Sequence, residues 1–327
     1  MNDQTNQDLH ESSMIALRDC MGLQAHETLL IVTDEVKREI GGSLHEAGKT
    51  LCRESLLIEM KAREVNGEEP PPLIADLMKK VDVVVCPTAK SLTHTDARRE
   101  AVKLGVRVGT MPGINPDTMK RCLSADYDKI IRLTHFIAKK LEGVSTIRVV
   151  TEKGTDLTMP VEGRKIIPST GVLRNKGESG NLPSGEVYLA PWEGRSNGRV
   201  VIDGSMAGLG MLEEDLVIDI RDGYAEEIQG GAQAGKLIGI FEKAGRDARA
   251  VAEFGIGTNY KAILTGMILE DEKVFGTIHV AFGNNLTMGG NISVNLHLDG
   301  LVREPDVYFD DELIMEKGKM VGYDEND

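Results

Sequence analysis

The sequence predicts two domains: an α/β domain over residues 1–143, doubly wound on a mostly parallel sheet, and a β-rich α+β domain over residues 144–327. Two observations predict this division. In the first part, short continuous apolar runs alternate with segments of helical periodicity, which is typical of parallel strands covered on both faces. After Gly143, apolar and polar residues alternate within short runs that end in turn residues, which is typical of antiparallel sheets. A length of 327 residues also suits two domains.

The elements of the α/β domain follow from these patterns in order. Apolar runs predict strands at 28–33, 55–58, 81–86 and 106–109. Helical periodicity predicts helices at 35–51, 72–80 and 95–104. Because strand, helix and parallel strand connect by right-handed crossovers, these helices should cover both faces of one sheet. The apolar pattern at 127–141 predicts a further helix that leads out of the domain.

The second domain begins with a predicted hairpin at 145–163, with Gly154 in its turn. Alternating runs at 198–206 and 216–228 predict further strands, and the second contains the turn signal Asp222-Gly223. One helical pattern, at 234–251, interrupts the strands.

Charge and composition exclude several classes of protein. The net charge is −14, from 38 Lys and Arg against 52 Asp and Glu, and no long basic run is present, so nucleic acid is not an expected partner. No apolar run approaches the roughly 20 residues of a spanning helix, and the polar N-terminus lacks the features of an export signal. The four cysteines form no C-x-x-C pair. We therefore expect a cytoplasmic protein with reduced thiols and no membrane partner.

The segment Asn291–Val302, NISVNLHLDGLV, is the first candidate for chemistry. As a strand it would place Ser293, Asn295, His297 and Asp299 on one face and apolar residues on the other. His297 and Asp299 would then lie about 6.5–7 Å apart along the strand, close enough to converge on one cation. A solvated strand face is the alternative interpretation.

A second strand, GTIHVAFGNN, carries His279, and a loop rich in Gly and Asn joins it to the first candidate segment. Such a loop lets backbone approach a bound group closely. A hydrogen-bonded core histidine is the alternative.

Glu186 and Glu253 each lie among apolar residues, where a carboxylate is unusual unless it is paired or bound to a cation. Burial against an arginine is the alternative for both.

Together Glu186, Glu253, His279, His297 and Asp299 supply three carboxylates and two imidazoles. That set can hold two divalent cations around a bridging carboxylate, or one cation on a face of two histidines and one carboxylate. The residues alone leave both arrangements open.

The motifs N-x-P-x-G-E-V-x-x-A-P, I-H-V-A-F-G and L-H-L-D occur in this order over about residues 180–302, with Glu253 between the first two. This series resembles the aminopeptidase T family of metallopeptidases. The resemblance implies that the five residues bind zinc, cobalt or manganese, and that the chain forms a homodimer. Those peptidases also carry a catalytic tyrosine shortly after the first histidine, whereas here the segment reads GNNLTMGG.

The stretch SLTHTDARREAVKLGVRVGTMPGI at 91–114 is more similar to a related branch that includes 2,5-dihydroxypyridine 5,6-dioxygenase, an iron(II) ring-opening enzyme of the same architecture. In that branch a histidine of the N-terminal domain acts as an acid or base, and the resemblance assigns this role to His94. The alternative is a position at a helix start, where Thr93 or Thr95 caps the helix.

Three functions follow. The leading prediction is a metal-dependent aminopeptidase that removes N-terminal residues from peptides, with Glu186 or Glu253 bridging metals or accepting a proton from a metal-activated water. The second is a mononuclear iron(II) dioxygenase acting on a hydroxylated N-heterocycle, with His297, Asp299 and His279 as ligands and His94 moving a proton. The third is a small-molecule binding protein that has lost turnover.

Overall fold

The structure is a computed structural model that describes residues 3–323. Its contacts divide the chain into two compact units. One unit holds the chain up to Ala125 together with Gly171–Ser184, and the other holds Asp126–Thr170 together with the chain from Gly185 onward. The chain therefore passes between the units three times, in place of the single division expected after residue 143.

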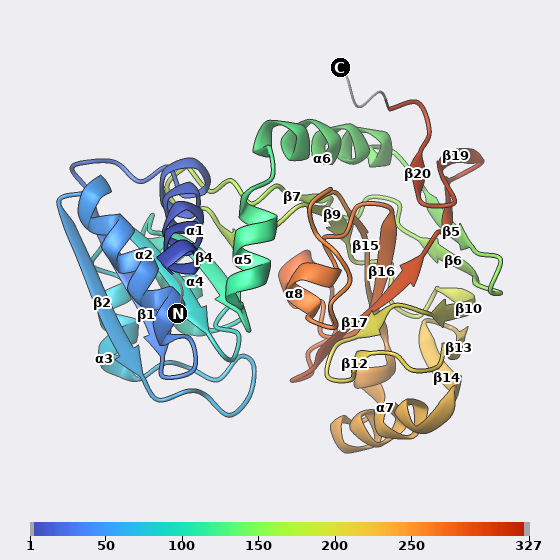
Figure 1. Ribbon diagram of the computed structural model, residues 1–327. Helices are drawn as coiled ribbons and strands as arrows, with labels where there is room; N and C mark the ends of the chain where they lie inside the picture. Colours follow the sequence, from blue (N-terminus) through green and yellow to red (C-terminus); the bar gives the residue numbers. More distant parts are fainter. Residues whose placement is uncertain (1–2, 324–327) are drawn as a thin grey trace. The chain divides into compact units, whose positions relative to one another are not determined.

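The first unit is built on a five-stranded sheet in the order β2-β1-β3-β4-β8, and every neighbouring pair is parallel. Strands β2, β1 and β4 of this sheet are labelled in Figure 1. The predicted doubly wound sheet is confirmed: the chain moves outward from β1 to β2, then crosses back to β3 and β4 on the other side of β1. The strands are β1 Thr28–Asp34, β2 Glu54–Met60, β3 Val83–Thr88, β4 Arg107–Pro112 and β8 Ser179–Asn181.

Helices fill the crossovers between these strands. Helices α3 and α4 share a hydrophobic cluster with Leu30, Val32 and Val84, so they cover one face of the sheet. Helix α4 begins after Thr95, whose hydroxyl accepts a hydrogen bond from the backbone N–H of Arg98. The helical segments of this unit are α1 Asp3–Met14, a π-helical turn at Ile15–Cys20, α2 Arg38–Leu51, α3 Pro72–Met78, α4 Asp96–Lys103 and α5 Pro116–Leu123.

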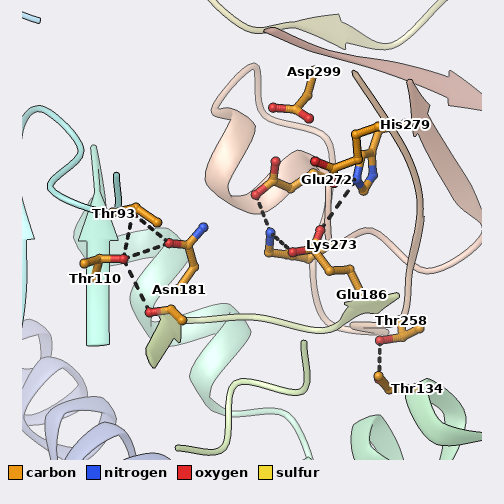
Figure 2. Close-up of polar contacts among 12 residues, drawn as sticks. Thr93, Thr110, Thr134, Asn181, Glu186, Thr258, Glu272, Lys273, His279 and Asp299 are labelled. Atoms are coloured by element: carbon orange, nitrogen blue, oxygen red, sulfur yellow. Dashed lines mark hydrogen bonds and ion pairs between the residues drawn. The ribbon is translucent and has the colours of Figure 1, made fainter. Parts of the chain in front are cut away.

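Strand β8 explains why residues 171–184 return to the first unit. It pairs in parallel with β4, and beyond this ladder the hydroxyl of Thr110 donates to Asn181 Oδ1 at 2.8 Å. Thr93 adds a contact of 2.8 Å to the hydroxyl of Thr110 (Figure 2). This fifth strand comes from far along the chain, so the local pattern of residues 1–143 could not indicate it.

The second unit contains two antiparallel sheets. The eight-stranded sheet has the order β14-β13-β10-β6-β5-β18-β19-β20, and the seven-stranded sheet has the order β12-β11-β17-β16-β15-β9-β7. One hydrophobic core draws side chains from both sheets and from helices α6 and α7. The strands are β5 Thr146–Val150, β6 Asp156–Pro160, β7 Ile167–Ser169, β9 Glu186–Leu189, β10 Asn197–Ile202, β11 Ser205–Met206, β12 Gly210–Met211, β13 Leu216–Arg221, β14 Tyr224–Gln229, β15 Val251–Gly257, β16 Thr277–Gly283, β17 His297–Arg303, β18 Asp306–Phe309, β19 Glu312–Glu316 and β20 Lys319–Met320.

Up to residue 323, this unit contains the α-helices α6 Tyr127–Leu141, α7 Gly231–Ala244 and the short α8 Ile268–Asp271, together with 3-10 turns at Arg246–Arg249 and Leu286–Met288. Helix α6 has the bounds predicted for it, but it belongs to the second unit. Its buried Thr134 meets Thr258, just beyond β15, with 2.7 Å between the hydroxyl oxygens (Figure 2). No helix among residues 3–323 is both long and apolar enough to cross a membrane.

Two predicted elements differ from the structure. The helix expected at 234–251 ends at Ala244, because Gly245 adopts a φ of +91° and terminates it, and Val251 already begins β15. The strand expected at Asn291–Val302 begins only at His297. The preceding residues are irregular because their carbonyl groups accept hydrogen bonds from Asn284. The backbone N–H of Asn284 donates to Leu296 O at 2.7 Å, and its side-chain amide donates to Val294 O at 3.0 Å.

Candidate metal centre

All five predicted ligands lie on one face of the seven-stranded sheet of the second unit. Strands β17, β16, β15 and β9 are consecutive neighbours in that sheet. Residues paired directly across antiparallel strands share a face. The register pairs His297 with Gly283, and Asp299 with Ala281. The opposite face carries Phe282, Phe254, Val187 and other apolar residues that pack in the core.

The remaining ligands follow from the neighbouring pairs. His279 lies opposite Gly255, and Glu186 lies opposite Gly257. The register shifts between Val251 and Glu253, which is a β-bulge. A bulge re-aims the residues beside it. Here it lets Val251 face the core while Glu253 faces the site.

Gly255 makes room for the His279 imidazole. A Cβ atom at this position would lie 2.1 Å from His279 Nε2 and 2.2 Å from Cε1. Both are far shorter than an ordinary contact of about 3.5 Å. The ring therefore lies directly over the backbone of β15, where a side chain at 255 would stand.

The Glu253 carboxylate joins the two histidines. Its Oε1 lies 3.1 Å from His279 Nε2, and its Oε2 lies 3.2 Å from His297 Nε2. His297 Nε2 is also 3.3 Å from Asp299 Oδ1. One ligand atom from each of Glu253, His297 and Asp299 lies within 4.8 Å of the others. This set of one imidazole and two carboxylates suits a divalent cation such as iron(II) or manganese(II).

The group differs from the two-histidine face expected for a mononuclear iron centre. Glu253 is its third member, and His279 adjoins the group through Glu253. His279 is fully buried, and its Nδ1 is without a hydrogen-bond partner in the described part of the chain.

A hydrogen bond to the backbone orients His297. Its Nδ1 lies 2.8 Å from Asn284 O, and because a carbonyl can only accept, Nδ1 carries the proton. Without a metal ion, Nε2 also carries a proton and donates to the carboxylates of Glu253 and Asp299, which raise the pKa of the ring. When that proton leaves, the neutral ring offers the lone pair of Nε2, as a metal ligand requires. The loop that supplies this carbonyl is itself held by Glu193, which accepts hydrogen bonds from Asn285 Nδ2 at 2.8 Å and from the N–H of Asn291 at 2.9 Å.

Two charged residues next to these ligands were not predicted. Lys273 is fully buried, and its Nζ donates to Glu186 Oε1 at 2.8 Å and to Glu272 Oε1 (Figure 2). Both lie in the run Glu270-Asp271-Glu272-Lys273, which reads in sequence like a solvated surface turn, so no pattern identified them. Glu186 is thus paired with a buried cation, as its alternative interpretation proposed, but with lysine instead of arginine.

The cluster holds four carboxylates, which belong to Glu186, Glu253, Glu272 and Asp299, beside one ammonium and two imidazoles. Burial raises the pKa of Glu186, and it raises the pKa of Glu272 to about 8 even beside Lys273, because one ammonium cannot balance two carboxylates. Burial lowers the pKa of His279, but its hydrogen bond and charge interaction with Glu253 outweigh this and raise the pKa to about 9. His297 likewise has a raised pKa, because Asp299 and Glu253 outweigh its burial. A divalent cation would supply the charge that these protons supply without it.

His94 lies apart from this group in the chain, in the first unit. It is exposed, and its carbonyl accepts a hydrogen bond from Arg99 Nη1 at 2.7 Å. Thr95 caps the helix that follows. The structure thus places His94 at a helix start, and its role as an acid or base remains a prediction.

These features define an α/β unit and a β-rich unit whose sheet carries a buried centre of carboxylates and imidazoles. The family model for 2,5-dihydroxypyridine 5,6-dioxygenase matches residues 44–322. The chain belongs to this family, and it is an enzyme. A curated relative, the 2,5-dihydroxypyridine 5,6-dioxygenase of Pseudomonas putida KT2440, is 24% identical over 263 residues, which is 76% of this chain and 73% of that protein.

Two solved structures share the fold. The structure of 2,5-dihydroxypyridine dioxygenase from P. putida KT2440 aligns with a TM-score of 0.86 and 19% identity, over 98% of this chain and 99% of that one. Wild-type AmpT from Thermus thermophilus aligns with a TM-score of 0.69 and 16% identity, over 96% and 99% of the two chains. At these identities both likenesses concern the fold.

The leading prediction, an aminopeptidase, is therefore wrong, and with it the classification as a hydrolase or protease that acts on peptides. The order of motifs from Glu186 to Asp299 follows one sheet face, and AmpT shares the fold that contains it. Such a series identifies the scaffold and leaves the reaction open. The segment after His279, which lacks a tyrosine, was the feature that already pointed away from the peptidases.

Proposed function

We propose that this protein is a mononuclear iron(II) dioxygenase that opens the ring of a small hydroxylated N-heterocycle of the dihydroxypyridine type. The observation that carries the proposal is the convergence of Glu253, His297 and Asp299 on one buried point, in a chain that belongs to the 2,5-dihydroxypyridine 5,6-dioxygenase family. Bound there, iron(II) would supply the one-electron chemistry that allows a closed-shell aromatic ring to react with dioxygen.

The protein's own contribution begins with the ligands. The hydrogen bond from His297 Nδ1 to Asn284 O keeps Nε2 available as a ligand, and the sheet fixes the spacing of His297 and Asp299. Glu253, Asp299 and His279 are buried, which limits the access of water to the centre and strengthens electrostatic interactions within it.

For His94 we propose proton transfer to or from the substrate through its imidazole, on the basis of the resemblance in 91–114 alone. The substitution His94→Gln tests this role, because it should lower turnover while leaving iron binding unchanged. The homodimer also remains a prediction, which the mass of the protein in solution would test.

The activity is tested with the metal-free protein loaded anaerobically with one equivalent of iron(II) and then mixed with 2,5-dihydroxypyridine and oxygen. We expect one oxygen molecule consumed for each ring lost, with both atoms of labelled oxygen in the ring-opened product. Asp299→Asn serves as the matched control, since it removes a ligand charge without changing side-chain size. If the iron-loaded protein consumes no oxygen with any dihydroxypyridine isomer, the proposal is refuted.

A further inference from the structure

The buried cluster consists of two half-sites that share Glu253. The first contains His297 and Asp299 beside Glu253 Oε2, at 3.2 Å from His297 and with 3.3 Å between His297 and Asp299. The second contains His279, at 3.1 Å from Glu253 Oε1 and 3.7 Å from Glu186 Oε2. Each half-site therefore offers one imidazole and two carboxylates. The donor chemistry alone would allow a cation in both.

The second half-site lies beside a positively charged group, the ammonium of Lys273. It is bonded to Glu186 and to Glu272, and its side chain is only 1% exposed. Within residues 3–323, the ion pair formed by the corresponding carboxylate of the first half-site, Asp299, is with His297. A positive charge is therefore already built into the second half-site.

The backbone holds this ammonium in place. The N–H of Lys273 donates to Glu270 O at 2.9 Å, and its carbonyl accepts from the N–H of Asn259 at 2.8 Å. The segment also passes closely over β15: a Cβ atom at Gly257 would lie 2.7 Å from the carbonyl carbon of Lys273 and 2.2 Å from Val274 O. Gly257 thus allows the lysine to reach the half-site from directly across the strand.

We propose that the Lys273 ammonium takes the place of a second metal ion, so that a centre with ligands for two divalent cations binds only one. The ammonium donates a hydrogen bond to one carboxylate oxygen of Glu186, which competes with metal binding by that oxygen. Its positive charge also repels a divalent cation at close range. The metal ion is left to Glu253, His297 and Asp299. This inference rests on the metal binding assumed in the proposed function, and it adds the reason why the centre would be mononuclear.

Manganese(II) is the probe, because it binds the same kinds of ligand, is stable in air at neutral pH and reports a neighbouring manganese ion by spin coupling in electron paramagnetic resonance. The metal-free full-length protein is titrated with Mn(II). We expect one ion per chain with an uncoupled signal. For Lys273→Met, which keeps the length of the side chain and removes its charge, we expect two ions per chain with a coupled signal.

Two further variants control the experiment. Lys273→Arg keeps the positive charge and should still bind one ion. The double variant Glu272→Gln with Lys273→Met removes one negative and one positive charge together, and it should bind two ions even if the single variant does not fold. Thermal melting monitors the folding of each.

The proposal is overturned if the wild-type centre binds two coupled ions, or if the folded methionine variants still bind one. Because the titration uses neither oxygen nor substrate, its outcome is separate from that of the proposed function. A protein that binds one ion and opens no ring would refute the dioxygenase and leave the role of Lys273 intact.

Discussion

The substitution Gly255→Ala tests whether the His279 ring requires a residue without a side chain at position 255. In an ordinary strand, replacing glycine by alanine stabilises by about 0.5–1 kcal/mol, because glycine loses more conformational freedom on folding. Here the new Cβ would lie 2.1 Å from His279 Nε2, so the ring must move by more than about 1 Å. Forcing an extra carbon into a packed site costs about 1–3 kcal/mol. We therefore expect a net loss of about 1–2 kcal/mol in the free energy of unfolding.

The measurement is urea unfolding of the metal-free protein, followed by the fluorescence of Trp192, the only tryptophan of the chain. Gly239→Ala is the matched control. Gly239 lies within helix α7, a Cβ there would meet nothing within 4 Å, and we expect it to stabilise by about 0.5–1 kcal/mol.

A double variant identifies the cause of the loss. With His279→Ala in place, the ring is gone, and Gly255→Ala should become neutral or stabilising, which corresponds to a coupling energy of about 2 kcal/mol. The reasoning is refuted if Gly255→Ala is as stable as the wild type, or if the loss is the same in both backgrounds.

Further predictions concern the ligands and their surroundings. His297→Ala should weaken Mn(II) binding by at least about 100-fold, since even outer-shell partners are worth 10–100-fold. Titration calorimetry would measure this, with the exposed His135→Ala as a control that leaves affinity unchanged. Mn(II) affinity should rise with pH between about 6 and 8, by up to tenfold per unit, because the raised pKa of His297 means that a proton must leave before the metal binds; a flat profile would contradict this. Asp271→Ala should lower the free energy of unfolding in urea by at least about 2 kcal/mol, because the buried carboxylate accepts hydrogen bonds from the Ser205 hydroxyl and from the N–H of Thr265. A decrease of less than about 0.5 kcal/mol would show that these donors find other partners.

The sequence contained much of the fold because its signals were local. The strands β1 to β4 and helix α6 follow directly from apolar runs and helical periodicity. The return of residues 171–184 was not predictable in this way, because β8 is specified by its pairing with β4 and by the contact of Asn181 with Thr110. Such long-range pairing leaves no periodic trace in a three-residue strand.

In the candidate site, too, residues with a local sequence signal could be predicted, and residues placed by long-range contacts could not. His297 and Asp299 could be paired from their spacing of two, and Glu186 and Glu253 could be noticed as carboxylates among apolar residues. Lys273 and Glu272 could not, because their burial depends on a loop that crosses β15 at Gly257. The irregular segment before His297 was missed because asparagine side chains compete with the backbone for hydrogen bonds, and alternation of residue types does not reveal that competition.

The two faces of the seven-stranded sheet in the second unit have different roles: one carries the candidate metal ligands, and the other packs in the hydrophobic core. Along β15, β16 and β17, one set of alternate residues packs in the core and the other set supplies ligands and the small residues between them. An exchange at Glu253 or His279 would change the donor set while the apolar residues on the opposite face stay the same. A scaffold of this kind can change its ligands one position at a time while it keeps its apolar core, which would let proteins with different reactions share one fold.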